Sequence, residues 1–270
     1  MTGAWLWLRS ERFNGFVAEE IKKKLTEYGL RGEIGSFGFA WDSQTAKLKD
    51  LKVFNQQTGQ LIASVNTIEL STEIRDLYAV KLSREITLKK LSLDGVEIFV
   101  EIDERGKSNF DGIHNAPPGS DTLKFDSTKL LTTLANSAIH FKDQQHKVSA
   151  DLNNLKASAQ PQASAFDIQL DANASRADYE GRAIPVNKLA VTARALPSGV
   201  EVGQFTLDSG LGEVKAKGKL EDFVALRYGF DVESNVKTDE LARFAFPQVA
   251  MRGAATVNGG QGGTGGQATV

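Results

Sequence analysis

The sequence predicts a mainly β protein: a long antiparallel β-meander with an N-terminal amphipathic helix and short interrupting helices. Two observations predict the strands. Apolar residues recur at every second position in many short segments, and turn-forming residues separate these segments along most of the 270 residues. Each strand therefore has one apolar face that must be covered. Alternation alone leaves open whether the meander folds into a sandwich or curls around something apolar.

The first predicted element is an amphipathic helix of roughly four turns, which ends near Gly29. Charged residues occupy the faces between its apolar side chains. We expect this helix to pack on a sheet rather than to bind a membrane surface. Its apolar positions are Phe13, Phe16, Val17, Ile21 and Leu25.

Alternation then continues to Ile102. The parity of the alternation shifts at Lys89-Lys90, which predicts a bulge or a short turn there. The alternating apolar positions are Phe37, Phe39, Trp41, Leu51, Val53, Leu61, Ala63, Val65, Ile68, Leu70, Ile86, Leu88, Leu91, Leu93, Val96, Ile98, Val100 and Ile102.

The middle of the chain is less regular. Consecutive prolines predict a loop over 114–121, because proline cannot join a strand ladder. The stretch DSTKLLTTLAN, residues 126–136, predicts a short helix with an acidic or hydroxyl N-cap. A hairpin with its turn at 142–146 follows, and Ile139 and Phe141 face one way before that turn.

Beyond residue 160, short strands recur about every ten residues, as all-β architectures do. One small helix interrupts them: Thr238 can cap it, acidic residues follow in its first turn, and Pro247 ends it. The glycines in GGQGGTGG, residues 259–266, are interpreted as flexible turn or inter-strand residues, because no helix follows them as a phosphate-binding loop would require.

Composition excludes several kinds of protein. The net charge of −2 provides no field for nucleic acid or an anionic membrane. The absence of cysteine excludes disulfides, thiolate metal sites and a cysteine nucleophile. The spacing of His114, His140 and His146 matches no metal motif, and no serine lies in a nucleophile-elbow sequence. We therefore predict no enzyme activity, no metal and no cofactor.

The stretch GVEIFVEIDERGKSNFDGI, from Gly95 to Ile113, could hold a carboxylate pair at Asp103 and Glu104 beside Arg105. A hairpin turn is the favoured interpretation, with Gly106 providing the permissive backbone. Spread-out acidic residues elsewhere are interpreted as solvated charges that guard sheet edges. A carbohydrate-processing protein would place exposed aromatic residues near paired carboxylates, and the aromatic spacing here does not.

Both ends of the sequence predict a longer parent protein. Trp5, Leu6, Trp7 and Leu8 stand directly before charged residues, as at the end of a membrane anchor. A disordered N-terminus with exposed tryptophans is the alternative. No stretch of about 18 apolar residues occurs.

Four stretches, taken in order, resemble the N-terminal region of the AsmA and TamB-like family of diderm bacteria. They are the Trp-rich start with its helix and YGLRGEIGSFGF, then LKDLKVFNQQTGQLIASVNTIELS, then ITLKKLSLDGVEIFVEIDERGKSNFDGI, and last FTLDSGLGEVKAKGKL with TDELARFAFPQVAMRGAATVNG. Asn109 matches an Asn of the family, and we expect it to bond backbone where the next strand begins. The C-terminal domain that identifies TamB itself is absent from this sequence.

The resemblance implies a non-enzymatic rod of antiparallel β-sheet, a long β-meander coiled into a taco-like groove. Such a protein is anchored once in the inner membrane, lies mostly in the periplasm and conducts phospholipids between the two membranes. An adaptor that contacts an outer-membrane assembly barrel is the alternative. The expected divisions are an anchor remnant at 1–12, a helix at 13–30, an AsmA-like β-domain at 31–160 and the start of the repetitive groove at 161–270. The residues expected to line the groove are Leu61, Val65, Leu88, Leu93, Val96, Ile98, Val100 and Ile102.

Overall fold

The computed structural model describes residues 11–73, 85–114, 124–222, 227–245, 254–264 and 267–269. The chain divides into two compact units, residues 1–145 and 146–270. Both consist mainly of long, mostly antiparallel strands, which confirms the predicted fold class. The domain boundary expected at 160/161 falls within a strand, Val148–Gln162. The expected anchor residues and the double-proline loop lie outside the described residues.

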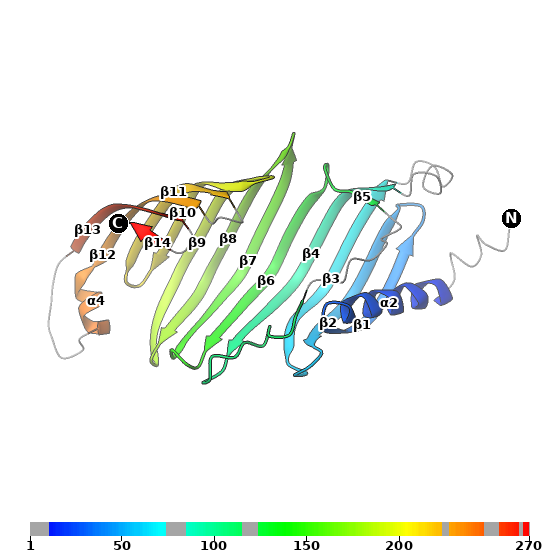
Figure 1. Ribbon diagram of the computed structural model, residues 1–270, viewed down its shortest axis with the longest axis horizontal. Helices are drawn as coiled ribbons and strands as arrows, with labels where there is room; N and C mark the ends of the chain where they lie inside the picture. Colours follow the sequence, from blue (N-terminus) through cyan, green and yellow to red (C-terminus); the bar gives the residue numbers. More distant parts are fainter. Residues whose placement is uncertain are drawn as a thin grey trace. The chain divides into compact units, whose positions relative to one another are not determined.

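Within its described residues, the first unit holds one helix and one sheet (Figure 1). Its strands follow the spatial order β1-β2-β3-β4-β6, with short β5 beside β4. The elements are α2 (Glu11–Thr26), β1 (Leu30–Ala40), β2 (Thr45–Asn55), β3 (Leu61–Glu73), β4 (Glu85–Ile102), β5 (Lys124–Asp126) and β6 (Leu131–Asp143).

The amphipathic helix α2 packs on β1, as predicted. The packing is close, because a Cβ added to Gly32 would lie 2.5 Å from Leu25 Cδ1. The chain leaves the helix through Gly29, whose φ of +77° is in the left-handed region that glycine tolerates best.

The prediction of a helix at 126–136 is wrong. The segment forms the end of β5, a turn and the first half of β6. Both β5 and β6 pair with β4 in parallel, for example Leu93 with Leu134 and Ile98 with Ile139. The turn residue Asp126 accepts hydrogen bonds from the Thr128 amide and hydroxyl, so the predicted helix cap serves a turn instead. Long-range pairing with β4 outweighs the weak local preference for a helix.

A line of kinks crosses the sheet of the first unit, and we call it the kink row. Its members lie at the same level of neighbouring strands, where the register of paired residues is interrupted: Asp50 on β2, Asn66 on β3, Gly95 on β4 and Asn136 on β6. Asp50, Gly95 and Asn136 have left-handed φ values of 53°, 64° and 50°. Asn136 Nδ2 donates to Asp94 Oδ1 over 2.7 Å.

At the kink row, the alternation of exposed and shielded positions along a strand shifts by one residue. In β2, Lys47 and Lys49 are exposed before the kink, and Asp50 and Lys52 are exposed after it. Leu48 is therefore on the same side as Leu51, although simple alternation would put them on opposite faces. The apolar side of each strand consequently stays on one face of the sheet over the strand's whole length.

The second unit contains the remaining strands in sequential order, with a short helix between two of them. Each pair from β7 to β14 is antiparallel. The elements are β7 (Val148–Gln162), β8 (Ala165–Tyr179), β9 (Arg182–Leu196), β10 (Gly199–Ser209), β11 (Gly212–Asp222), β12 (Arg227–Lys237), α4 (Thr238–Ala245), β13 (Ala254–Thr264) and β14 (Gln267–Thr269).

Three predictions about this part of the chain can be assessed. The helix expected from Thr238 forms as α4, while its expected end at Pro247 lies outside the described residues. The hairpin turn expected at 142–146 agrees with the end of β6 at Asp143 and the start of β7 at Val148. The interpretation of the glycines at 259–263 as turn residues is wrong, because they belong to β13 and pair with β12.

The same kink occurs in the second unit. Asn154 on β7 and Ala174 on β8 have left-handed φ values of 49° and 50°. A buried serine follows the kink in each unit, Ser137 and Ser175, exposed to 2% and 6%. Each hydroxyl accepts a hydrogen bond from an amide of the neighbouring strand and donates to the carbonyl two residues back in its own strand. The kinks therefore leave no buried side-chain polar atom of the described residues unpaired.

We expect Ala174→Gly to raise the free energy of unfolding by about 1 kcal/mol, because alanine incurs a steric cost in the left-handed region that glycine avoids. Ala172→Gly is the matched control: Ala172 is 1% exposed and its φ is not in that region, so glycine there should destabilise the strand. Urea unfolding of both variants measures the effects. A loss of stability in Ala174→Gly would contradict the strain at this kink.

Candidate functional site

One face of the first unit's sheet is lined by aliphatic and aromatic side chains, and we call it the apolar face. Cross-strand pairing arranges these side chains in rows that begin at β1, three of which reach β6 and one of which ends at β4. Two rows lie on one side of the kink row and two on the other. The rows are Gly32–Val53–Ala63–Ile98–Ile139, Ile34–Leu51–Val65–Val96, Phe37–Leu48–Ile68–Leu93–Leu134 and Phe39–Ala46–Leu70–Leu91–Thr132.

Seven of the eight predicted groove residues lie on this face, and four of them, Val65, Leu93, Val96 and Ile98, are members of the rows. Val65 faces Val96, and Ile98 lies between Ala63 and Ile139. Further along β4, Val100 faces Phe141 and Ile102 faces Asp143 in the same parallel register.

The predicted parity shift at Lys89-Lys90 is present as a register shift. Ser71 pairs with Lys90 and Thr72 with Leu88, which leaves Lys89 as the extra residue. The bulge keeps Leu88 on the same side as Leu91 and Leu93, so both predicted leucines, Leu88 and Leu93, belong to the apolar face.

Leu61 is the exception. It pairs with Phe54 across a second register shift, and Phe54 itself pairs with Arg31. The Arg31 guanidinium lies 4.2 Å from the centre of the Phe54 ring. Leu61 therefore shares a row with a cation and an aromatic ring and not with the apolar rows.

Sequence reasoning missed the contribution of β6. The alternation at Ile139 and Phe141 predicts a hairpin strand, but it does not place these residues on the apolar face. Leu134 belongs to the segment for which the sequence predicts a helix. The parallel register to β4 brings all three beside the predicted residues.

The apolar face is only partly covered. Among the described hydrophobic side chains of the first unit, those that are buried are Leu48, Ile62 and Val65. Most other members of the rows are half-buried. All described strands of this unit belong to one sheet, and the helix α2 covers the face at Gly32. This partial cover differs from a sandwich, in which a second sheet buries such a face.

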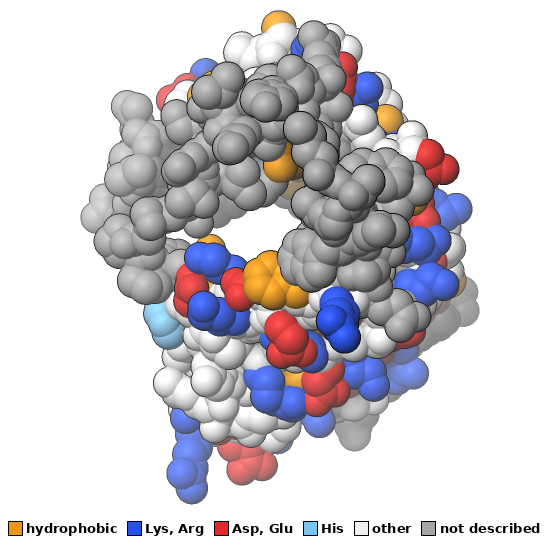
Figure 2. All heavy atoms as spheres, turned by 90° about the vertical axis from the view of Figure 1, so that its right-hand side faces the viewer, with side chains coloured by type: hydrophobic (Ala, Val, Ile, Leu, Met, Phe, Trp, Pro, Cys, Tyr) orange, Lys and Arg blue, Asp and Glu red, His pale blue; other side chains and the backbone are white. Residues whose placement is uncertain are grey.

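The opposite face of the sheet is polar. Lys47 and Glu69 form a cross-strand ion pair, and the hydrogen bond and charge of Lys47 lower the pKa of Glu69. Ser64 donates to Glu97 over 3.3 Å. Figure 2, viewed from the side of α2 and β1, shows acidic and basic side chains interspersed over this end of the molecule. Exposed pairs of this kind contribute little stability, but they keep this face hydrated.

Two buried asparagines fasten the strand ends. Asn55, fully buried, donates to the carbonyls of Asn109 and Asp111 and accepts from two amides of its own turn. Asn109, 2% exposed, donates to Phe99 O over 2.8 Å and accepts from Glu101 N over 2.9 Å. We expected Asn109 to bond backbone where the next strand begins. It bonds the end of the preceding strand, β4, because the chain folds back there after the turn.

The acidic stretch at 103–107 is a turn. Asp103 Oδ1 accepts hydrogen bonds from the amides of Arg105 and Lys107, each over 2.8 Å. These two hydrogen bonds lower the pKa of Asp103, and the bond from the Lys107 amide has the larger effect. Gly106 has a φ of +77°, as predicted for the permissive turn position. The carboxylate is thus engaged with turn amides.

Acid should loosen this turn. Because the pKa of Asp103 is lowered by folding, its stabilising effect is complete above the ordinary pKa of aspartate, about 3.9, and is lost as pH falls through the lowered value. We expect the amide proton shifts of Arg105 and Lys107 to titrate together in this acidic range by NMR. In Asp103→Asn they should not titrate. Persistence of the titration in that variant would assign it to another group.

The histidines form no metal cluster. His140 stacks on Phe99 with ring centres 5.0 Å apart, and His114 Nδ1 lies 3.1 Å from Gly112 O. Within the part of the chain that the structure describes, no group of three potential ligands comes together.

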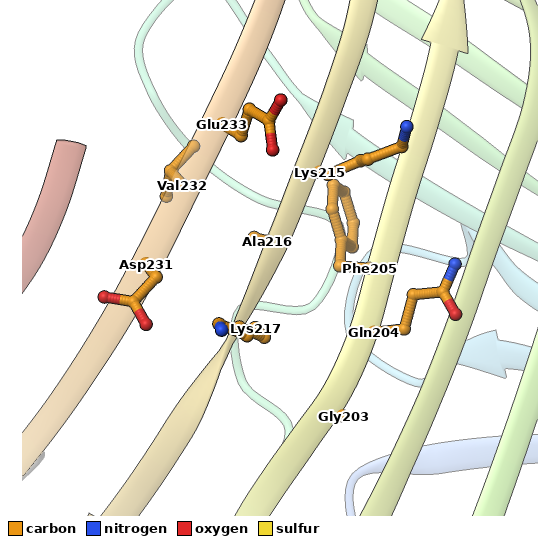
Figure 3. A pocket seen from close by; sticks show the side chains of 9 residues that line it. All are labelled: Gly203, Gln204, Phe205, Lys215, Ala216, Lys217, Asp231, Val232 and Glu233. Atoms are coloured by element: carbon orange, nitrogen blue, oxygen red, sulfur yellow. The ribbon is translucent and has the colours of Figure 1, made fainter. Parts of the chain in front are cut away.

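The second unit has an apolar face of its own. One row runs from Ala157 through Leu170 and Val191 to Phe205, and then through Ala216 to Val232. Around the last part of this row lies an open cavity of about 680 Å³ (Figure 3). Figure 3 shows its lining residues on β10, β11 and β12. On β11 and β12, the exposed positions beside the row carry charge. Glu213, through a hydrogen bond and its charge, raises the pKa of Lys215.

No known family model matches the chain, and no curated protein matches it. Within the described residues, no helix is both long enough and apolar enough to cross a bilayer. The fold and the site therefore define the class: a mainly β protein whose open sheet presents an apolar face.

Proposed function

We propose that this chain shields and conducts lipid acyl chains along its apolar sheet faces. One observation supports this proposal. In the first unit, the apolar rows on both sides of the kink row lie on the same face of the sheet, and most of their side chains are half-buried. Large apolar surfaces that a fold leaves uncovered are typical of binding surfaces. Aliphatic side chains offer an acyl chain no hydrogen-bonding group and no deep specific pocket, so the chain can slide.

The energetics favour such a surface. Removing one methylene from water is favourable by about 0.8 kcal/mol of transfer free energy. Moving a 16-carbon chain from a bilayer into water therefore costs on the order of 12 kcal/mol. A phospholipid with two chains loses roughly twice that amount. A continuous apolar face offsets most of this loss at every step.

In the cell, the proposal assigns this chain to the periplasm of a diderm bacterium, with phospholipids as cargo and an N-terminal anchor in the inner membrane. The resemblance of the four sequence stretches supports this setting. A role purely as an adaptor for an outer-membrane barrel would need the same strands but no bound lipid, so lipid content separates the two functions.

The test is lipid mass spectrometry of the purified protein. We expect co-purified phospholipid, and we expect Ile98→Lys to reduce it at least fivefold, because the substitution places a charge in the middle of an apolar row. Glu97→Lys, on the neighbouring residue of the opposite face, should retain the lipid. Circular dichroism checks that both variants fold. Absence of phospholipid from the unsubstituted protein would favour the adaptor.

A further inference from the structure

The short helix α4 lies against the strand ends of the second unit. The Arg182 guanidinium donates to the carbonyl of Phe244 in the last turn of α4, and it lies 6.0 Å from the centre of the Phe244 ring. The rings of Tyr179 and Phe244 are 6.4 Å apart. At the other end of the helix, Lys237 N donates to Leu211 O over 2.9 Å. Both ends of α4 are thus attached to the turns between strands.

An open cavity of about 310 Å³ lies between α4 and the ends of β9 and β10. Ile184, Pro185, Leu211 and Phe244 supply apolar walls. Ala242, the one described α4 side chain that is nine-tenths buried, is small. An open cavity with apolar walls and a few polar groups at its rim is typical of a small-ligand site.

Charge is confined to two lining residues, Arg182 and Glu240. Arg182 is exposed and keeps guanidinium donors beyond the one used by Phe244 O. A polar headgroup can therefore stay in water beside Arg182 while a chain enters between the apolar walls. The volume is at the lower end of the range for small-ligand pockets, about 300–1,000 Å³, which suits one acyl chain and not two.

We propose that the cavity beneath α4 binds the end of one acyl chain of a single-chain anionic amphiphile, with its headgroup at Arg182. This inference rests on the proposed function, since both require acyl-chain binding, but it concerns a different site. Ile184 lies both on the shielded side of β9, where it pairs with Ala177, and in the lining of the cavity. It therefore connects the apolar face of the second unit with the cavity beneath α4.

The experiment uses a dodecanoic acid that carries a photoreactive diazirine near its end, with adducts mapped by peptide mass spectrometry. We expect adducts on residues 182–186, 209–212 or α4. Leu211→Trp should fill the cavity and reduce these adducts at least tenfold. Leu241→Trp is the matched control, because Leu241 is 40% exposed on the same helix and is not part of the cavity lining.

Ile184→Phe fills the cavity from the strand side and serves as a second variant if Leu211→Trp does not fold. Undiminished adducts in the folded filling variants, or adducts on β4 but none beneath α4, would overturn the inference while leaving the proposed function intact. No adduct anywhere in the chain would contradict both.

Discussion

Replacing Gly95 with alanine should lower the free energy of unfolding by about 3 kcal/mol. Gly95 has a φ of +64°, where a side chain costs roughly 1–2 kcal/mol. Its new Cβ would also lie 2.1 Å from Asn66 Nδ2 and 3.0 Å from Asn66 Cβ. Asn66 would have to move, and it stands in the kink row itself, so overpacking adds a further 1–2 kcal/mol or so. Urea unfolding measures the loss.

Gly59→Ala separates the two causes. Gly59 has a similar φ of +72°, but nothing lies within 4 Å of the position that its Cβ would take. We expect this variant to lose only about 1 kcal/mol, the backbone term alone. Equal losses at Gly59 and Gly95 would show that close packing against Asn66 contributes nothing.

Replacing Asn55 with alanine should cost about 3–4 kcal/mol. The fully buried side chain makes four hydrogen bonds, two as donor to the carbonyls of Asn109 and Asp111 and two as acceptor within its own turn. Alanine leaves these groups without their partner, and each buried unpaired group costs about 1–3 kcal/mol. Water reaching some of them limits the total.

Gln56→Ala is the matched control, since Gln56 is exposed and adjacent. It should stay within about 0.5 kcal/mol of the parent protein. Amide hydrogen exchange gives a second measure: in Asn55→Ala, the segment 103–113 should exchange faster, because Asn55 fastens it to the end of β2. Unchanged exchange there would contradict the role of Asn55 as the fastening residue.

Much of the β structure follows from local pattern. Val96, Ile98, Val100 and Ile102 alternate in the sequence and lie in one strand, and a strand needs only this period to place them on one side. The helix from Glu11 to Thr26 likewise follows from apolar residues at helical spacing.

The segment 126–136 shows where local pattern fails. Its leucines and potential cap favour a helix, while parallel pairing with β4 makes most of it a strand. The partner lies about 40 residues away in the sequence, and no local preference reports such a contact. The prediction for Asn109 was wrong for a similar reason. The sequence shows a polar side chain there, but it does not show that its backbone partners, Phe99 and Glu101, lie on β4.

The candidate site was predicted in part for the same reason. Alternation along β3 and β4 selected Val65, Leu88, Leu93, Val96 and Ile98, and the bulge at Lys89 was readable as a change of parity. Leu61 was placed by the same alternation, but a register shift in the pairing of β2 and β3 moves it into the row of Phe54. The register is a property of two paired strands, so the sequence of one strand does not reveal such a shift.

The sequence by itself determined that the chain forms strands with one apolar side, because that property depends only on which residues stand two positions apart. Whether the apolar stretches before and after Asp50, Asn66, Gly95 and Asn136 share a face was decided by tertiary structure alone. Each strand changes parity at those residues, and pairing aligns the changes into one row. The physical reason is that the face on which a residue lies depends on the register between paired strands, and no single strand's sequence contains that register.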